Sequence, residues 1–428
     1  MKRYIMIMMY FSVMICFAYA VEIGPAIEVA GQAKGSRNQT WAYAGWNEGA
    51  KCWLVVWREG YLNEQQCDIW CARVSADGKA LDSGGVKLTA GNTFCDMPRV
   101  ASDGKKFFVV WEEMTKNRDW DVYGVIISVD GNVQVGEKIL VAGGDHNQCR
   151  ADVAFAGGKY YVVWMGYESN VYNIYGRRIS SEGKPEGNEA MLVAGVKSDK
   201  PDNPVSAVLP VIAGNGRGDL LTAFHVEGAF RIGYVGRRAI DTGTGQVTGS
   251  DIIGARDKQR IGSMGWGGRE RRIALAMGKE EAITVSIAET MRSKNDIVIG
   301  RLSAKGELLG VQEASAGNLG ITEQFKPLSS RSAVAYTGKY YIVVSEVLSP
   351  VDPKKKQRSS DVYARVVGWK ITPEGNVEGE AFGIAGEPGK ECVLPCVASG
   401  SPDTCLVVYS EIRGVDDVKV MGRIMKVN

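Results

Sequence analysis

The chain has 428 residues, and its 51 basic and 49 acidic side chains give a formal net charge of +2 at pH 7. This balance excludes a protein that attracts nucleic acid through a generally basic surface. A length near 400 residues ordinarily corresponds to two or three domains, yet no linker, low-complexity tract or change in composition divides the chain. A single repeated architecture explains this better.

The N-terminus has the pattern of a secretory signal peptide. Lys2 and Arg3 precede an apolar run over residues 5–18, and small residues follow at Ala18 and Ala20. Residues 1–20 are expected to be removed, which leaves one domain over residues 21–428. Because Lys2 and Arg3 are lost with them, the mature chain keeps 51 − 2 = 49 basic residues against 49 acidic ones. No later stretch is long and apolar enough for a membrane span, so a periplasmic, cell-surface or secreted location is expected.

Short β-strands recur along the chain in groups of four. Residues 24–31 match the last strand of such a group, but no other three strands precede them. The last group has only three strands, at residues 395–398, 406–409 and 418–425. Complete groups lie between these ends, at about residues 41–91, 98–143, 160–195, 211–254, 273–317 and 333–386.

Residues 98–143 show the order of one group most clearly. The expected strands cover residues 99–101 and 107–111 and begin again at Asp121 and at Lys138. Turns of the Asp-Gly type at residues 103–104 and 130–131 separate them.

Six complete groups, one group without its last strand and one isolated last strand make seven sheets. A period of roughly 50 to 60 residues with four strands each is typical of a β-propeller. The sequence therefore predicts an all-β, seven-bladed β-propeller of four-stranded antiparallel sheets. The N-terminal strand is expected to complete the last blade, so that the ends of the chain meet and the sheet edges are protected.

The repeated residues resemble those of a known class of repeat. Val-Val-Trp ends the second strand at Trp111 and Trp164, and an acidic residue or Asn followed by Val/Ile-Tyr-Gly opens the third strand at Asp121 and Asn173. The pattern resembles secreted bacterial β-propeller repeats over nearly the whole mature chain, least in the fourth and fifth groups. This resemblance implies the fold and an extracytoplasmic location. It implies no catalytic residue, because such repeats accompany many functions.

Candidate ligand-binding residues lie in the loops of one rim. In a propeller, the loops from strand two to strand three and from strand four to the next blade share a rim, which is usually the binding face. Acidic, aromatic and basic side chains together suit a polar ligand such as a sugar chain. The Trp residues that end strand two are expected in the core instead. The candidates are Arg58, Glu59, Glu112, Glu113, His146, Tyr167, His225, Glu346 and Arg413.

The cysteines indicate disulfides. Removing Cys16 with the signal peptide leaves eight of the nine, an even number in a protein expected to be exported. Four of them lie in or beside loops of the same rim, and the sequence leaves open which of their three possible pairings forms. These four are Cys67, Cys95, Cys149 and Cys392. The preferred pairs are Cys396 with Cys405, Cys52 with Cys71, and, among those four, Cys95 with Cys149 and Cys67 with Cys392.

Motifs for catalysis or metal binding are scarce. The mature chain has two histidines, His146 and His225, and no paired Cys-x-x-Cys, so neither a metal site nor a cofactor is predicted. The sequence contains no Gly-x-Ser-x-Gly nucleophile motif and no zinc-protease helix motif. A glycosidase needs two carboxylates several ångströms apart across a sugar, and the rim carboxylates could supply them only if their loops converge.

These features lead to one hypothesis and two alternatives. The leading hypothesis is an exported, monomeric, non-catalytic propeller that binds a carbohydrate or a protein through its loop rim. The first alternative is a polysaccharide-acting hydrolase or lyase that uses rim carboxylates with His146 or His225. The second is a structural subunit of a cell-surface assembly.

Overall fold

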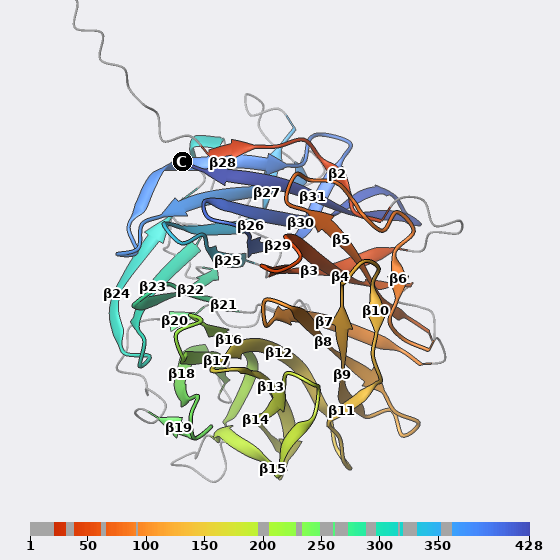
Figure 1. Cartoon of the computed structure of the whole chain (residues 1–428). Helices are drawn as coiled ribbons and strands as arrows, with labels where there is room; N and C mark the ends of the chain where they lie inside the picture. Colours follow the sequence, from red (N-terminus) through yellow and green to blue (C-terminus); the bar gives the residue numbers. More distant parts are fainter. Residues whose placement is uncertain are drawn as a thin grey trace, which may run out of the picture.

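The computed structural model describes residues 21–30, 38–60, 66–90, 93–195, 205–227, 233–248, 260–261, 273–287, 297–315, 317–319, 332–351 and 362–428. The expected signal peptide lies outside these residues. Within them the chain forms β-strands and one short 3-10 helix, η1 (Gly317–Leu319). No helix of this described part is long and apolar enough to cross a membrane. The strands form seven sheets around a common centre (Figure 1).

The first three blades each begin at the centre of the ring and end at its edge. Blade 1 consists of β3 (Gln39–Asn47), β4 (Cys52–Glu59), β5 (Asp68–Ser75) and β6 (Val86–Lys87). Blade 2 consists of β7 (Cys95–Ser102), β8 (Lys106–Met114) and β9 (Trp120–Ser128), with β10 (Gln134–Val135) and β11 (Ile139–Ala142) both paired to β9. Blade 3 consists of β12 (Gln148–Ala156), β13 (Lys159–Glu168), β14 (Val171–Ser180) and β15 (Pro185–Ala194).

The next three blades repeat this order. Blade 4 consists of β16 (Ser206–Gly214), β17 (Asp219–Glu227) and β18 (Gly233–Asp241), with β19 (Val247–Thr248) and β20 (Arg260–Ile261) paired to β18. Blade 5 consists of β21 (Ala274–Met277), β22 (Glu281–Ile287), β23 (Ile297–Ser303) and β24 (Leu308–Ala314). Blade 6 consists of β25 (Ser332–Tyr336), β26 (Tyr341–Pro350), β27 (Val362–Ile371) and β28 (Val377–Ala385).

Blade 7 joins the two ends of the chain. Its three inner strands are β29 (Glu391–Ser399), β30 (Thr404–Gly414) and β31 (Asp417–Val427), and its outer strand comes from β1 (Val21–Ile23) and β2 (Ile27–Glu28). Val21 pairs with Val427, and Ile27 pairs with Gly422. The seven-bladed propeller closed by its N-terminal strand is thus confirmed.

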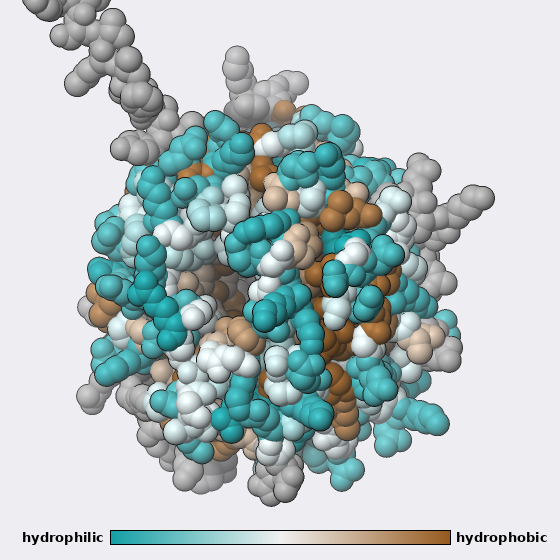
Figure 2. Space-filling model, in the orientation of Figure 1, coloured by the Kyte–Doolittle hydropathy of each residue, from teal (hydrophilic) through white to brown (hydrophobic). Residues whose placement is uncertain are grey.

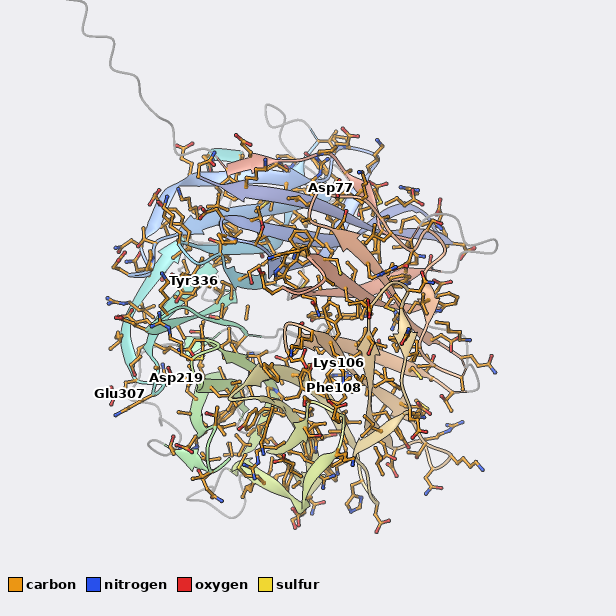
Figure 3. The ribbon with its side chains drawn as sticks, viewed as in Figure 1. Asp77, Lys106, Phe108, Asp219, Glu307 and Tyr336 are labelled. Carbon is orange, nitrogen blue, oxygen red and sulfur yellow. The ribbon has the colours of Figure 1, made fainter. Side chains whose placement is uncertain are left out.

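The core lies between neighbouring blades. Both faces of a blade are covered, so the second strand is a continuous apolar run instead of an alternating one. Trp57, Trp111 and Trp164 end these runs and are buried, as the repeats predict. Phe108 of blade 2 packs against Tyr160 of blade 3 with ring centroids 5.2 Å apart (Figure 3). Each such buried aromatic side chain stabilises the fold by about 1.5–3 kcal/mol.

The innermost strands of five blades share a β-bulge. Each has a register shift against its second strand. At this shift stands a residue with positive φ that is not glycine, which costs about 1–3 kcal/mol and persists only where neighbours hold it. The five residues are Trp41, Met97, Arg150, Leu209 and Leu394. The contacts that hold this bulge decide where several candidate site residues lie.

Candidate functional site

Four candidate residues occupy one equivalent place in four blades. Each directly follows the position of the repeated Trp at the end of strand two, and each side chain is buried, with 1% to 5% exposure. They are Arg58, Glu112, His225 and Glu346. The structure therefore turns these side chains toward the packing between blades, away from the surface of the rim.

Glu112 and Glu346 hold the bulge of the following blade. Glu112 accepts a hydrogen bond from the main-chain N–H of Arg150 at 2.8 Å and also pairs with the Arg150 guanidinium. Glu346 accepts a hydrogen bond from the main-chain N–H of Leu394 at 3.0 Å. Arg150 and Leu394 are the bulge residues of blades 3 and 7. Both carboxylates therefore join one blade to the next, since a buried N–H must be paired.

Arg58 reaches the next bulge by a different route. Its guanidinium donates to Asp96 of blade 2 at 3.0 Å, and Asp96 accepts from the main-chain N–H of the bulge residue Met97 at 2.8 Å. Arg58 and Asp96 therefore both help to join blade 1 to blade 2.

Glu59 and Glu113 cap the repeated tryptophans. The indole N–H of Trp57 donates to Glu59, and that of Trp111 donates to Glu113, both at 3.2 Å. Glu113 also pairs with Lys138 at 2.7 Å. The hydrogen bonds of these carboxylates therefore stay within their own blades.

Arg413 lies at the closure of the ring. It pairs with Glu411 at 2.7 Å and with Glu28 of the N-terminal strand β2 at 3.3 Å. Its ion pairs help to hold β2 against β31.

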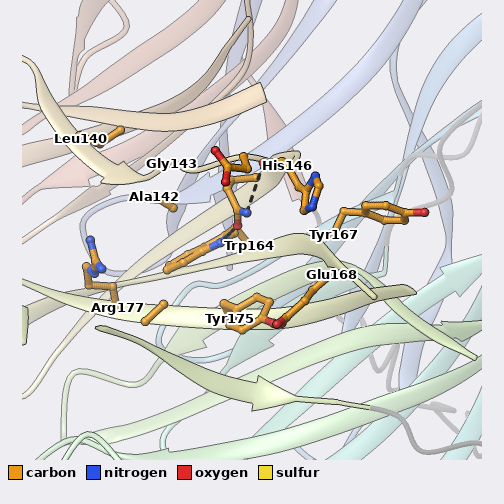
Figure 4. A pocket seen from close by; sticks show the side chains of 12 residues that line it. Leu140, Ala142, Gly143, His146, Trp164, Tyr167, Glu168, Tyr175 and Arg177 are labelled. Carbon is orange, nitrogen blue, oxygen red and sulfur yellow. Dashed lines mark hydrogen bonds between the residues drawn. The ribbon is translucent and has the colours of Figure 1, made fainter. Parts of the chain in front are cut away.

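His146 and Tyr167 come together in an open groove between blades 2 and 3 (Figure 4). This blade 2–3 groove has a volume of about 430 Å³ and is formed by the loop after β11, the end of β13 and the middle of β14. Its polar and aromatic lining residues are Asp145, His146, Gln148, Trp164, Tyr167, Glu168, Tyr175 and Arg177.

Aromatic rings form the floor and one wall of the groove. Trp164 and Tyr175 are stacked with centroids 6.4 Å apart, and His146 stands edge-on to Tyr167 at 6.0 Å. The indole N–H of Trp164 donates to the side-chain oxygen of Gln148 at 2.7 Å, which orients that amide. The groove therefore presents ring faces beside groups that form hydrogen bonds.

The charged groups of the groove are partly oriented. The hydroxyl of Tyr175 donates to Glu168, and Arg177 donates to the main-chain oxygen of Val141 at 2.8 Å. Burial raises the pKa of Tyr175, and its hydrogen bond with Glu168 raises it further. Tyr175 thus stays a neutral donor at neutral pH, while Glu168 is exposed and can accept from a ligand.

Sequence reasoning missed Tyr175, Arg177 and Gln148 as site residues, whereas it correctly placed Trp164 in the core, where its side chain borders the groove with 1% exposure. Trp164 and Tyr175 belong to the residues that recur from blade to blade, and this recurrence indicated a role in the fold alone. The side chains of Tyr175 and Arg177 share one face of β14 because their positions differ by two. This spacing was a usable signal once the strand was placed.

The centre of the ring holds a smaller cavity of about 120 Å³, and the face seen in Figure 2 is hollowed there. Arg99 lies 3.6 Å from Asp152 and 3.6 Å from the ring centroid of Tyr43. The charges that line this channel are therefore paired with each other. Among the described residues, no group of three or more His, Cys, Asp or Glu is placed to hold a metal ion.

The cysteines are buried, and no disulfide joins them in the described part of the chain. In blade 7, Cys396 faces Val408 and Cys405 faces Ser399. The two cysteines are offset by three residues, about 10 Å, and so lie on opposite faces of the sheet. A disulfide needs Cα atoms within about 7 Å, so this register does not support the expected pair.

Register also separates the second expected pair. Cys52 faces Ser75, and Cys71 faces Val56, an offset of four residues or about 13 Å. The sequence placed these cysteines on consecutive strands correctly but could not show how far along the strands they meet.

The loop cysteines are distributed over different blade boundaries. Cys95 packs between blades 1 and 2, whereas Cys149 packs between blades 3 and 4. Cys392 packs between blades 6 and 7. The main-chain oxygen of Cys67 accepts a hydrogen bond from the N–H of Cys95 at 3.0 Å. The backbone therefore brings Cys67 beside Cys95, whereas the two members of each preferred pair, Cys95 with Cys149 and Cys67 with Cys392, lie at different blade boundaries.

Comparison with known proteins shows the fold alone. No family model matches the sequence, and no curated protein matches it significantly. The polysaccharide lyase Uly1 superposes with a TM-score of 0.52 at 10% identity, over 92% of this chain and 91% of that chain. The phage phi92 endosialidase superposes with a TM-score of 0.51 at 9% identity, over 95% of this chain and 69% of that chain.

Proposed function

We propose that the protein is an exported, non-catalytic propeller that binds an oligosaccharide in the blade 2–3 groove. One observation carries the proposal: the rings of Tyr167 and Tyr175 converge with the exposed side chains of His146 and Glu168 in one open groove, beside the buried ring of Trp164. A pyranose ring has apolar C–H faces that pack on aromatic rings and hydroxyl groups that need several hydrogen-bond partners. A volume of about 430 Å³ is in the range of small-molecule sites.

The position of the groove supports this proposal. It lies on the rim that the sequence indicates as the binding face, and it is open to solvent, so a sugar chain can extend beyond it. Carboxylate, amide, imidazole and guanidinium groups supply both acceptors and donors. The signal-peptide pattern at residues 1–20 supports export, which would bring the protein to extracellular glycans.

The test uses the mature chain, residues 21–428, on a glycan array, followed by titration calorimetry with the strongest neutral ligand. Tyr167→Ala removes one wall of the groove and is expected to weaken binding about tenfold, the effect of truncating an aromatic contact. Tyr336→Ala is the matched control. Tyr167 packs on Tyr172 with ring centroids 5.0 Å apart, and Tyr336 packs on Tyr341 at 4.7 Å, but Tyr336 (labelled in Figure 3) precedes a turn from strand one to strand two, at the other end of the strands from Tyr167. This control should change affinity less than twofold. Absence of binding to every glycan, or equal losses in both variants, contradicts the proposal.

A second candidate function is a polysaccharide-acting hydrolase or lyase. It is favoured by the titratable groups Asp145, His146, Glu168 and Tyr175, which line one groove. Incubation with polysaccharides should then release products, and Tyr175→Phe, which keeps the aromatic ring, should abolish the release while leaving glycan affinity within a few fold. Binding without any product supports the non-catalytic proposal.

A further inference from the structure

A second groove lies at the equivalent place between blades 6 and 7. This blade 6–7 groove has a volume of about 280 Å³ and includes Arg365, Gly386, Lys390, Cys392, Tyr409 and Arg423 in its lining. The strand registers establish the equivalence. Cys392 pairs two residues beyond Tyr409, as Gln148 does beyond Trp164. Arg423 stands two residues after the partner of Tyr409, as Arg177 stands after the partner of Trp164.

The charges of the two grooves differ. Glu387 and Glu411 are the carboxylates that line the blade 6–7 groove. Glu387 pairs with Lys390 at 3.0 Å, and Glu411 pairs with Arg413 at 2.7 Å. Both carboxylates are therefore already neutralised by other cations. Arg365 and Arg423 remain, and neither guanidinium has an ion pair among the described residues.

Each of these two arginines has an unused donor. The Nε atoms of Arg365 and Arg423 are buried and form no hydrogen bond within the described part of the chain. Arg423 uses one Nη1 donor on the main-chain oxygen of Gly24, at 2.9 Å. A guanidinium offers five N–H donors in a planar fork, and an unpaired buried donor is costly. The buried Nε atoms face away from solvent, so an occupant reaches the two guanidinium groups through their remaining N–H groups. Two such charges that line one groove, without an ion pair among the described residues, favour an occupant that accepts hydrogen bonds and carries negative charge.

Two glycines make room for the Arg365 side chain. A Cβ atom at Gly383 would lie 2.1 Å from Nη2 of Arg365, and one at Gly386 would lie 2.6 Å from its Cβ. Gly386 also has a φ of 99°, a conformation that glycine adopts without strain. The local sequence thus accommodates this guanidinium at the groove.

We propose that the blade 6–7 groove binds an oxyanion, namely a carboxylate, sulfate or phosphate group, between the guanidinium groups of Arg365 and Arg423. Two oxygen atoms of a carboxylate, sulfate or phosphate group match the guanidinium fork, which binds them through paired, charge-assisted hydrogen bonds. The remaining lining suits this use, since Tyr409 is a neutral hydrogen-bonding residue and burial raises the pKa of Cys392 to about 12, which keeps its thiol uncharged. The site is separate from the blade 2–3 groove and does not depend on the function proposed for it.

The experiment measures binding of three probes to the mature chain by titration calorimetry at low salt. The probes are sodium sulfate, an oligogalacturonate, and the methyl ester of the same oligosaccharide, which is neutral. Sulfate and the oligogalacturonate are expected to bind in a way that depends on Arg365, whereas any binding of the neutral ester, for example in the blade 2–3 groove, is not expected to depend on Arg365. Competition between sulfate and the oligogalacturonate then identifies the kind of ligand. Similar affinities indicate a site for free oxyanions, whereas tighter binding of the oligogalacturonate indicates a site for acidic glycans.

Variants then locate the site. Arg365→Gln is expected to weaken oxyanion binding at least tenfold, and Arg365→Lys to weaken it less. Lys390→Gln is the matched control, because it removes the same charge from the same groove but from a cation already paired with Glu387; a loss under threefold is expected. Thermal unfolding of each variant establishes that it is folded. Failure of both anionic probes to bind, an equal loss of ester binding in Arg365→Gln, or equal losses of oxyanion binding in Arg365→Gln and Lys390→Gln overturns the proposal.

Discussion

The blade 2–3 groove and the blade 6–7 groove occupy equivalent places in the ring but have different chemistry. Both have an aromatic residue at the end of strand two, Trp164 or Tyr409, and an arginine on strand three, Arg177 or Arg423. The first adds further aromatic rings, whereas the second adds a second arginine and has its carboxylates paired with other cations. The repeated strands thus fix a common frame, and the residues around it decide which ligand each groove suits.

The largest expected effect on stability comes from removing the carboxylates that hold the bulges between blades. Glu112→Ala leaves the N–H of the Arg150 bulge and its guanidinium without their buried partner, and Glu346→Ala does the same to the N–H of Leu394. Losses of about 3 and 2 kcal/mol in the free energy of unfolding are expected, from the cost of charged hydrogen bonds and unpaired buried donors. Urea unfolding measures them. Glu182→Ala, which removes an exposed pair with Lys106, should leave the free energy of unfolding almost unchanged. An equally small effect at Glu112 would show that the contacts between blades do not depend on its carboxylate.

A steric change tests the second arginine of the blade 6–7 groove. Gly383→Ala would place a Cβ against the end of the Arg365 side chain, which can move away, so the fold should persist while the guanidinium is displaced. A loss of about fivefold in oxyanion affinity is expected by calorimetry, with little change in the melting temperature. Gly310→Ala is the control, since its added Cβ would meet no neighbour within 4 Å. Unchanged oxyanion affinity in Gly383→Ala would argue against a role for the Arg365 position.

The thiol of Cys392 gives the smallest effect and a pH dependence. Burial, aided by Glu411, raises its pKa to about 12, so at pH 8 only about one molecule in 10⁴ carries the reactive thiolate. Alkylation of Cys392, followed by mass spectrometry, should be slow in the native protein at pH 8 and rise tenfold per pH unit up to about pH 12.

The raised pKa of Cys392 also predicts how the stability of the fold depends on pH. The neutral thiol is favoured in the folded state, so its contribution is fully present below the unfolded pKa near 8.5 and is lost as the pH rises toward 12. Rapid native alkylation of Cys392 at pH 8 would show that this groove is more open than the structure indicates.

The fold could be predicted from the sequence because its evidence is local and repeated. Val-Val-Trp runs and Asp-Gly turns mark strands and turns one blade at a time, and the unpaired strands at the two ends require closure. Register could not be predicted in this way. A shift of a few residues leaves the pattern of Cys396 and Cys405 unchanged in the sequence but moves the thiols apart and onto opposite faces.

The candidate site could be predicted only in part for the same reason. His146 and Tyr167 lie in the blade 2–3 groove, because they follow the ends of strands and stay on the rim. Glu112 and Glu346 look equally exposed in the sequence, yet a bulge in the neighbouring blade needs their carboxylates. That need arises from contacts between blades, which no single repeat contains.

The most direct test of the central claim is a crossed titration of Tyr167→Ala and Arg365→Gln with one neutral and one acidic oligosaccharide. If the two grooves bind different ligands, Tyr167→Ala weakens only the neutral ligand, about tenfold, and Arg365→Gln weakens only the acidic ligand, by at least as much. Loss of the same ligand in both variants, or of neither ligand, would contradict the claim that equivalent grooves of this ring bind different ligands.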